Sequence, residues 1–356
     1  MARATRRPVR LDLALQGGGA HGAFTWGVLE RLLEEERIQL SGISGASAGA
    51  MNAVVLADGW LKGGAAGARA ALWRFWKRMS RAARRQSPFR SPFAAVFPPG
   101  LAWSGEAAMR LFVAPWAAMF QAMAGNPSPY QFNPLNLNPL LDILRDSVDF
   151  ARLRAAESPR LLIAATDLRS GEMRIFRNAE LTAEAVMASA CLPNLFQAVE
   201  IEGNAYWDGG YLANPPLFPL LHEDGADDLL LVQLNPPRRE AVPRSTDAIM
   251  ARLNEVTFNA GLVRELRGLA LLREALAEEG EDHEFRNPFF ARVKRLRLHR
   301  IAASEDDIRL RPGSKLDPEW GALIRLHGLG ARAAEAWLAG HGASLGRQST
   351  LGREAG

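Results

Sequence analysis

By length and composition the chain is a globular protein with room for one large core or two smaller ones: it has 356 residues, 48% of them hydrophobic and 23% charged. Its single cysteine, Cys191, excludes an internal disulfide and fits a reducing compartment. The formal net charge is only +4, but basic residues are concentrated between Asp58 and Glu106, where no acidic residue occurs. No nucleic-acid-binding motif accompanies that charge, so we expect no nucleic-acid partner.

The first ten residues are basic, and we expect them to be flexible. The apolar segment that follows them ends within a few residues at Gln16 and the glycines, which is too short for the core of a signal peptide. No later apolar run reaches the roughly 20 residues that a membrane span needs. We therefore expect a soluble, cytoplasmic protein that touches membranes only peripherally.

Residues 11–57 alternate between short apolar runs and helical periodicity. Residues 11–15 and 38–43 are predicted to be buried strands, and residues 24–33 and 47–57 are predicted to be the helices that follow them. This order predicts parallel strands with helices on both faces of the sheet. The fold class that we expect is therefore α/β, a three-layer sandwich with a mostly parallel central sheet.

Residues 60–130 differ in composition from the residues before them, because they hold five of the nine tryptophans among prolines and arginines. We expect a cap-like insertion there. The strand pattern then resumes, and a hairpin with a Gly-Asn turn is predicted to end at Asp208. The strands after the insertion are expected at residues 161–166, 173–176, 199–207 and 229–234.

The main α/β domain is thus expected to cover residues 11–236, and residues 237–345 are predicted to form a mainly helical region packed on it. Within that region residues 293–301 alternate with basic residues as an edge strand does, and residues 319–338 are predicted to be the last helix. Residues 346–356 are expected to be a flexible tail.

Two glycine motifs each join a predicted strand to a predicted helix. Ser47 is the centre of Gly45-Ala-Ser-Ala-Gly49, and a nucleophile on such a sharp turn needs small neighbours that leave its hydroxyl exposed. The alternative is a tight turn in which Ser47 only caps the helix. The loop Gly17-Gly-Gly-Ala-His-Gly22 can direct backbone N–H groups at a phosphate or an oxyanion. Its spacing also matches the dinucleotide-binding pattern, but the acidic residue that this pattern needs about twenty residues later is missing.

A third motif, Trp207-Asp208-Gly209-Gly210, follows a short predicted strand and precedes Asn214-Pro215. By itself Asp-Gly is most often a surface turn. The order of the three motifs, however, resembles the patatin-like phospholipase family, and the resemblance extends to Ala188-Ser-Ala-Cys-Leu-Pro193. It covers roughly residues 11–216.

The resemblance implies a lipid acyl hydrolase that works without a cofactor or a metal. It implies that Ser47 is the nucleophile and Asp208 the general base, with no histidine required. The glycine loop is implied to form the oxyanion hole; its residues are Gly17, Gly18, Gly19, His21 and Gly22. Gly45 and Gly49 would shape the nucleophile turn, and Gly209 and Gly210 would support the aspartate.

His21 is where this chain departs from the family, whose loops commonly carry Arg or Lys before the last glycine. An imidazole has an unperturbed pKa near 6.5, so its charge would depend on pH. We therefore expect the amides of residues 17–19 to stabilise the oxyanion. A carboxylate with a reference pKa of about 3.9 is ionised at neutral pH but is a weak base, so this stabilisation has to supply much of the rate.

Residues 60–90 alternate aromatic and basic side chains, for which two interpretations are open. The helix can lie in a lipid interface and make peripheral membrane contact, with its Trp and Leu side chains inserted. Alternatively, Leu72, Trp73 and Trp76 pack on the core and the basic face is solvated. Cys191, among small apolar residues, is expected to be a buried thiol.

Two other functions stay open at the level of sequence. One is a different ester hydrolase, either a triad esterase or an intracellular polyester depolymerase. The Ser-Asp-His triad of such an esterase would combine Ser47 with one of the downstream histidines, which are His222, His299 and His327. The other is a lipid- or nucleotide-binding protein without hydrolytic activity. Phospholipids, neutral lipids and polyesters all present an ester to the same groups, so the sequence does not select among them.

Overall fold

The computed structural model describes residues 8–351 except 87–127, 158, 223–224, 237–238, 240–241, 280–284, 305–314 and 316–317. The part of the predicted flexible N-terminus at residues 1–7 lies outside the described residues. Val9 and Arg10 belong to the first strand, so the prediction of flexibility was wrong for these two.

A single mixed sheet of eight strands forms the centre of the molecule, in the order β5-β6-β3-β2-β1-β7-β8, with β4 paired to β3. Five neighbouring strands are parallel: β1 (Val9–Leu15), β2 (Ile38–Gly45), β3 (Arg160–Asp167), β7 (Asp228–Gln233) and β8 (Arg297–Ala302). Three strands pair antiparallel at one end: β4 (Met173–Arg177), β5 (Val199–Ile201) and β6 (Asn204–Asp208).

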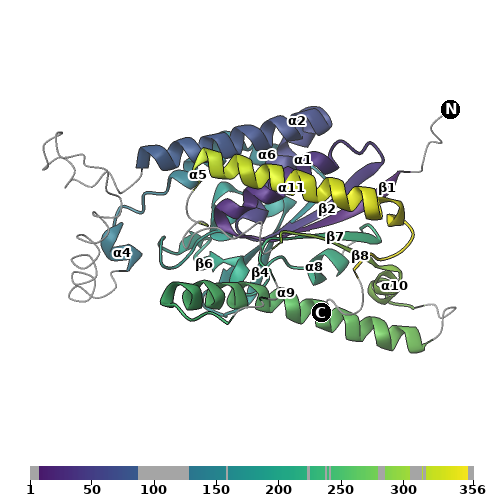
Figure 1. Cartoon of the computed structure of the whole chain (residues 1–356). Helices are drawn as coiled ribbons and strands as arrows, with labels where there is room; N and C mark the ends of the chain where they lie inside the picture. The colour runs from purple at the N-terminus through teal and green to yellow at the C-terminus, as the bar shows by residue number, and fades with distance from the viewer. Residues whose placement is uncertain are drawn as a thin grey trace, which may run out of the picture.

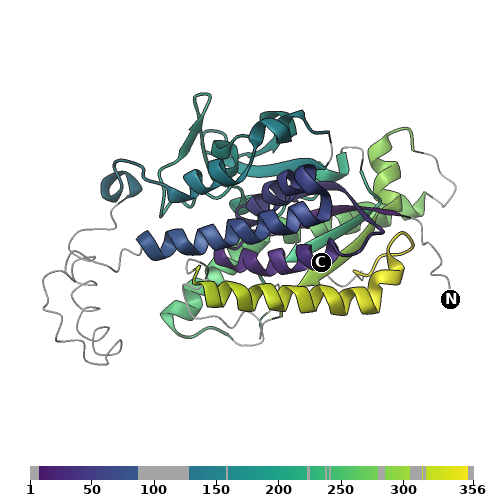
Figure 2. The ribbon, with the colours of Figure 1, turned by 90° about the horizontal axis from the view of Figure 1, so that it is seen from above.

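Helices cover both faces of this sheet, which confirms the predicted three-layer α/β sandwich (Figures 1 and 2). One layer contains α1 (Gly22–Leu32), α2 (Ala48–Gln86) and α11 (Trp320–His341). The opposite layer contains α8 (Phe218–His222), α9 (Thr246–Glu278) and α10 (Pro288–Arg295). Four short helices lie at the β3 end: α4 (Pro129–Phe132), α5 (Pro139–Ser147), α6 (Phe150–Ala155) and α7 (Ala183–Ala188).

Alternating side chains of the central strands supply the two cores. Leu13 and Leu15 of β1 pack with the α1 and α2 layer, whereas Ala14 packs with the α8 and α9 layer. Because both faces are covered, the strands are apolar at nearly every position, as parallel strands in α/β proteins are. Among the buried charged exceptions, Asp12 of β1 is fully buried and paired with Arg292 of α10 at 2.6 Å.

The predicted hairpin is present, but its turn is formed by Glu202 and Gly203, with φ angles of 50° and 78°, and not by Gly-Asn. Two positive φ angles in a row are typical of the tight hairpin turn whose twist matches that of the strands. The predicted edge strand begins only at Arg297, because residues 288–295 form α10. The last helix agrees closely with its prediction and starts after Glu319, whose carboxylate caps it.

Residues 60–86, the first part of the predicted insertion, lie in α2. The helix bends at Gly63 and Gly64, whose dihedral angles are not helical, and then runs on to Gln86. Leu72 and Trp76 are buried in the main core, whereas Trp73 is 48% exposed. The buried apolar side of this helix therefore favours core packing over insertion into lipid. Residues 87–127, the rest of the predicted cap, lie outside the described residues.

The C-terminal segment is attached to the sheet as far as Leu351, so the prediction of a flexible tail was wrong for residues 346–351. Leu298 of β8 donates its N–H to Ser349 Oγ at 3.1 Å and accepts from the N–H of Thr350 at 2.9 Å. Gly346 donates its N–H to Asp228 Oδ1 at 2.9 Å. Residues 352–356 lie outside the described residues.

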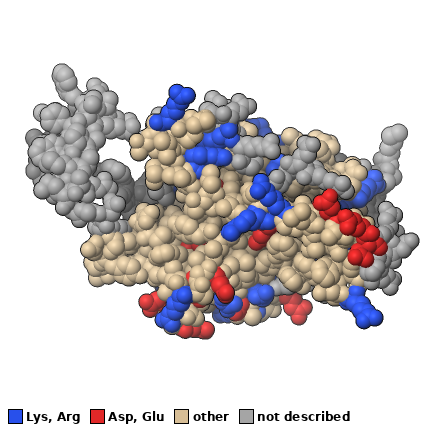
Figure 3. All heavy atoms as spheres, turned by 90° about the horizontal axis from the view of Figure 1, so that it is seen from below, with Lys and Arg blue, Asp and Glu red and all other residues tan. Residues whose placement is uncertain are grey.

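The N-terminal half of α9 exposes a row of large apolar side chains. Ile249, Met250, Leu253 and Val256 are 42%, 60%, 54% and 51% exposed. Figure 3 views the side that α9 covers, where a broad uncharged area is bordered by both basic and acidic side chains. Contiguous exposed apolar surface of this kind is typical of an interaction site. Within the described part of the chain, no helix is long and apolar enough to cross a bilayer.

Candidate active site

Ser47 occupies the sharp turn between β2 and α2. Its φ angle of 53° is in the left-handed region, which a residue with a side chain adopts only when its surroundings enforce it. A Cβ on Gly49 would lie 2.0 Å from the carbonyl oxygen of Leu15, so β1 can pass this close only to a glycine. Ala46 and Ala48 are buried while Ser47 is partly exposed, as a nucleophile turn requires.

Asp208 ends β6 and is fully buried. Its Oδ1 accepts the N–H of Gly210 at 2.7 Å. Burial raises the pKa of Asp208 to about 7, while the Gly210 N–H and the Ser47 hydroxyl act in the opposite direction. Oδ2 has no partner of normal hydrogen-bond geometry among the described residues. The contact with Ser47 is therefore looser than a standard hydrogen bond, as is common in catalytic sites without substrate.

One short segment after α7 holds both side chains in place. The carbonyl oxygen of Ser189 accepts the N–H of Ser47 at 2.9 Å and the N–H of Gly209 at 3.3 Å. The carbonyl oxygen of Cys191 accepts the N–H of Asp208 at 2.9 Å. The serine turn and the aspartate, 161 positions apart in the numbering, are thus fixed to the same three residues.

The thiol of Cys191 is buried, as predicted, and donates to the carbonyl oxygen of Gln197 at 3.1 Å. Burial raises its pKa to about 12, so it is protonated at neutral pH. A thiolate at this position is therefore excluded as a competing nucleophile.

The glycine-rich loop lies directly against the serine, because a Cβ on Gly17 would be 2.7 Å from Ser47 Cβ. The N–H of Gly17 already donates to Asn214 Oδ1 at 2.6 Å, and the N–H of Gly22 bonds back to Ala20 and Gly19. These two amides are therefore already hydrogen-bonded within the chain. No partner is seen for the N–H groups of Gly18 and Gly19 in the described part of the chain, so they are the donors that stay available.

His21 is 3% exposed, and burial followed by the nearby charge of Lys315 lowers its pKa to about 3. The imidazole is therefore neutral at physiological pH and does not replace the charge of the usual Arg or Lys. The reference pKa of an exposed imidazole does not apply to this buried ring.

The three histidines considered for a triad all have partners other than Ser47 and Asp208. His299 bonds Asp228 Oδ1 at 2.9 Å, His327 bonds Glu30 Oε2 at 2.7 Å, and His222 stacks on Phe289. The structure gives the triad alternative no support. A cavity of about 270 Å³ between α1, α2 and the amino ends of β1 and β2 is also remote from the serine, since residues such as Leu29, Ile38 and Trp60 line it.

Sequence reasoning missed the buried polar residues that hold the glycine loop. Gln16 donates to Asn259 Oδ1 at 2.8 Å and accepts the N–H groups of Leu234 and Asn235, both at 2.7 Å. Gln16, Asn214 and Asn259 are all buried. The one signal in the sequence was Gln16, a polar residue at the end of an apolar strand. Such a residue does not reveal which side chains it will bond.

The serine turn, the glycine loop and the aspartate meet where β1 and β2 end, which is where ligands bind in parallel α/β sheets. This arrangement defines an α/β protein with a site at the carboxyl edge of its sheet. The model of the patatin-like phospholipase family matches residues 13–221, and the chain belongs to this family. Residues 222–351, which include β8, α9 and α11, lie beyond the match.

Comparison with curated proteins gives no match. Two solved structures are similar to the chain. VipD from Legionella pneumophila is 16% identical with a TM-score of 0.39, over 96% of this chain and 72% of that one. The heterodimeric ExoU–SpcU complex of the type III secretion system of Pseudomonas aeruginosa gives 18% identity and a TM-score of 0.33, over 94% and 76% of the two chains.

Proposed function

We propose that the protein is a serine-dependent lipid acyl hydrolase in which Ser47 attacks the ester carbonyl and Asp208 accepts the proton of its hydroxyl. The observation that supports this most strongly is a fully buried carboxyl group beside the one partly exposed serine on a strained strand-to-helix turn. Family membership supports the substrate class, because the family is that of patatin-like phospholipases.

The raised pKa of Asp208 changes the expected strength of the base. A carboxylate with a pKa near 7 accepts a proton far more readily than an exposed one with a pKa of about 3.9, and it is still half ionised at neutral pH. Burial of the carboxyl group therefore gives it a basicity closer to that of the histidine in a triad.

In the first step the Ser47 oxygen forms a bond to the carbonyl carbon and its proton passes to Asp208. The amides of Gly18 and Gly19 are the donors available to the oxyanion, which then collapses as the alcohol takes up the proton and leaves. In the second step water gives a proton to Asp208 as its oxygen attacks the acyl carbon. The resulting intermediate expels the Ser47 oxygen, which takes the proton back from Asp208 as the fatty acid leaves.

The surface that meets lipid is, in this proposal, the apolar row on α9 and not residues 60–90. Phe258 of the same helix packs against Gly210, and Asn259 bonds Gln16, so this half of α9 borders the site. Leu72 and Trp76, which the sequence offered for insertion, are in the core.

The proposal is tested by hydrolysis of p-nitrophenyl butyrate by the Ser47→Ala and Asp208→Asn proteins. Each is expected to lose about a thousandfold or more in kcat, because nucleophile and base act as a unit. The matched controls are Ser170→Ala and Asp142→Asn, which change exposed residues of the same types. Activity of Asp208→Asn close to that of the wild type would refute the dyad.

A further inference from the structure

The carbonyl oxygen of Lys315 closes over the glycine-rich loop from a segment far outside the family match. A Cβ on Gly19 would lie 2.2 Å from this oxygen, and Gly19 has a φ angle of 58°. Only a glycine allows the two backbones to approach this closely. Lys315 is therefore in backbone contact with one of the two residues whose amides remain available.

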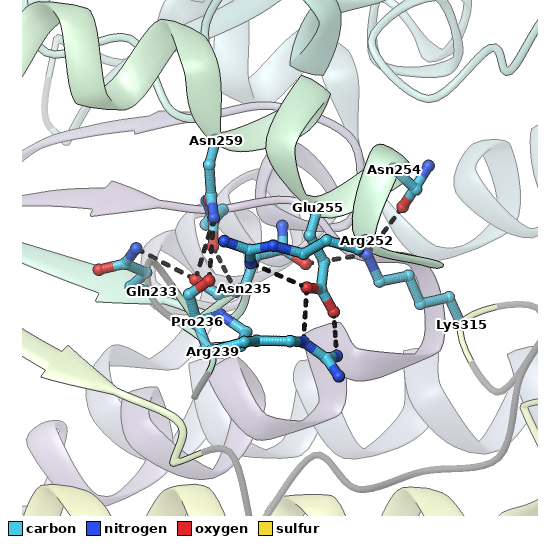
Figure 4. Close-up of polar contacts among 10 residues, drawn as sticks. Gln233, Asn235, Pro236, Arg239, Arg252, Asn254, Glu255, Asn259 and Lys315 are labelled. Atoms are coloured by element: carbon cyan, nitrogen blue, oxygen red, sulfur yellow. Dashed lines mark hydrogen bonds and ion pairs between the residues drawn. The ribbon is translucent and has the colours of Figure 1, made fainter. Parts of the chain in front are cut away.

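The ammonium group of Lys315 is fixed by two amide oxygens. It donates to Asn235 Oδ1 at 2.8 Å and to Asn254 Oδ1 at 2.9 Å (Figure 4). The N–H of Asn235 in turn donates to Gln16, the residue directly before the loop. Both the backbone and the side chain of Lys315 are thus connected to the chain that carries Gly17, Gly18 and Gly19.

Two charged side chains among the described residues influence the pKa of Lys315. Glu255 favours the ammonium form, while burial, as the largest influence, and Arg239 lower the pKa of Lys315. Glu255 is itself shared by Arg239 at 2.9 Å and Arg252 at 3.2 Å, so it does not cancel Lys315 (Figure 4). The charge of Lys315 reaches the loop, since it helps to lower the pKa of His21.

We propose that Lys315 is a positioning residue for the oxyanion loop: its backbone packs on Gly19, and its ammonium group, held by Asn235 and Asn254, places a fixed positive charge beside the loop. This inference rests on the proposed hydrolase function. In this proposal Lys315 supplies the positive charge that the neutral His21 of the loop does not. A positive charge near a developing oxyanion stabilises the transition state more than the bound ester.

The test compares Lys315→Met, Lys315→Arg and Lys294→Met in the full-length protein with p-nitrophenyl butyrate. Lys315→Met is expected to lower kcat about tenfold or more with KM within about twofold, because the charge acts mainly on the transition state. Lys315→Arg is expected to recover most of the loss. Lys294→Met, which removes a lysine of α10 that packs on Phe285, is expected to keep wild-type kcat.

A second variant keeps the test valid if Lys315→Met does not fold. Asn254 is exposed on α9, so Asn254→Asp alters the charge beside Lys315 without touching the loop. We expect its kcat to fall severalfold at low salt and to recover partly at high salt. Wild-type kcat in Asn254→Asp, or a loss in Lys315→Met that arginine does not recover, overturns the inference. If wild-type enzyme and Ser47→Ala were equally active, the proposed function would fail instead.

Discussion

At the scale of the residue, burial sets the chemistry of the site. Asp208 and His21 are both almost without solvent contact, and burial disfavours the charged form of each. The same effect raises the pKa of the carboxyl group to about 7 and lowers that of the imidazole to about 3. The carboxylate of Asp208 becomes a stronger base, and the imidazole of His21 stays neutral.

The pH dependence of kcat/KM follows from the raised pKa of Asp208. The protonated carboxyl group cannot accept the Ser47 proton, so activity is expected to rise with pH and to level off above about 7. Below that value kcat/KM should fall about tenfold per pH unit. A pH–rate profile of ester hydrolysis checks this, and a profile that stays flat down to pH 5 would show a base of ordinary pKa.

Ser47 and Asp208 could be proposed as candidates from local sequence because each lies in a short motif with its own turn geometry. Which amides of the glycine-rich loop are free to donate could not be predicted in this way. Whether the amide of Gly17 is free depends on Asn214, 197 positions away, and no local pattern encodes that bond. The charge of His21 depends in the same way on its burial and on Lys315.

At the scale of the element, glycines allow helices and strands to approach until their backbones touch. On α11, a Cβ at Gly330 would lie 2.0 Å from the carbonyl oxygen of Phe24 in α1. Strands and helices were predicted well from apolar periodicity, since burial imposes that period directly. The helical segment that follows the kink of α2 at Gly63 and Gly64 was not predicted, because two adjacent glycines normally end a helix.

Gly330→Ala is expected to destabilise the protein by about 1–3 kcal/mol, because the added methyl group has to separate α1 from α11. Gly328→Ala is the matched control on the same helix. Its nearest neighbour would be Arg332 Nη1 at 3.4 Å, so it should gain up to about 1 kcal/mol from helix propensity. Urea unfolding measures both, and equal stability of the two variants would contradict the close packing.

At the scale of the whole molecule, the residues that the family model matches, 13–221, form only part of the sheet and of the helical layers that cover it. β8 extends the sheet beyond β7, α11 covers one face, and α9 borders the site from the other (Figure 1). The sequence predicted this region as mainly helical. It did not predict that the tail to residue 351 would be attached to β8, since single hydrogen bonds such as that of Ser349 leave no periodic signal.

If α9 meets lipid, Leu253→Asp should lower hydrolysis of phosphatidylcholine–phosphatidylglycerol vesicles about tenfold, because a buried leucine contributes roughly 1.5–3 kcal/mol. Hydrolysis of soluble p-nitrophenyl butyrate should not change. Leu271→Asp is the control, since Leu271 is 67% exposed on the other half of the same helix. Equal vesicle activity of the two variants would exclude α9 as the contact.

The central claim is that one serine is activated by one buried aspartate. It is tested most directly by incubating the wild type and Asp208→Asn with a fluorophosphonate and locating the adduct by mass spectrometry. We predict rapid modification of Ser47 in the wild type and a rate lower by about a hundredfold or more in Asp208→Asn, because the base is lost. Modification of another residue, or equal rates in the two proteins, would contradict the account.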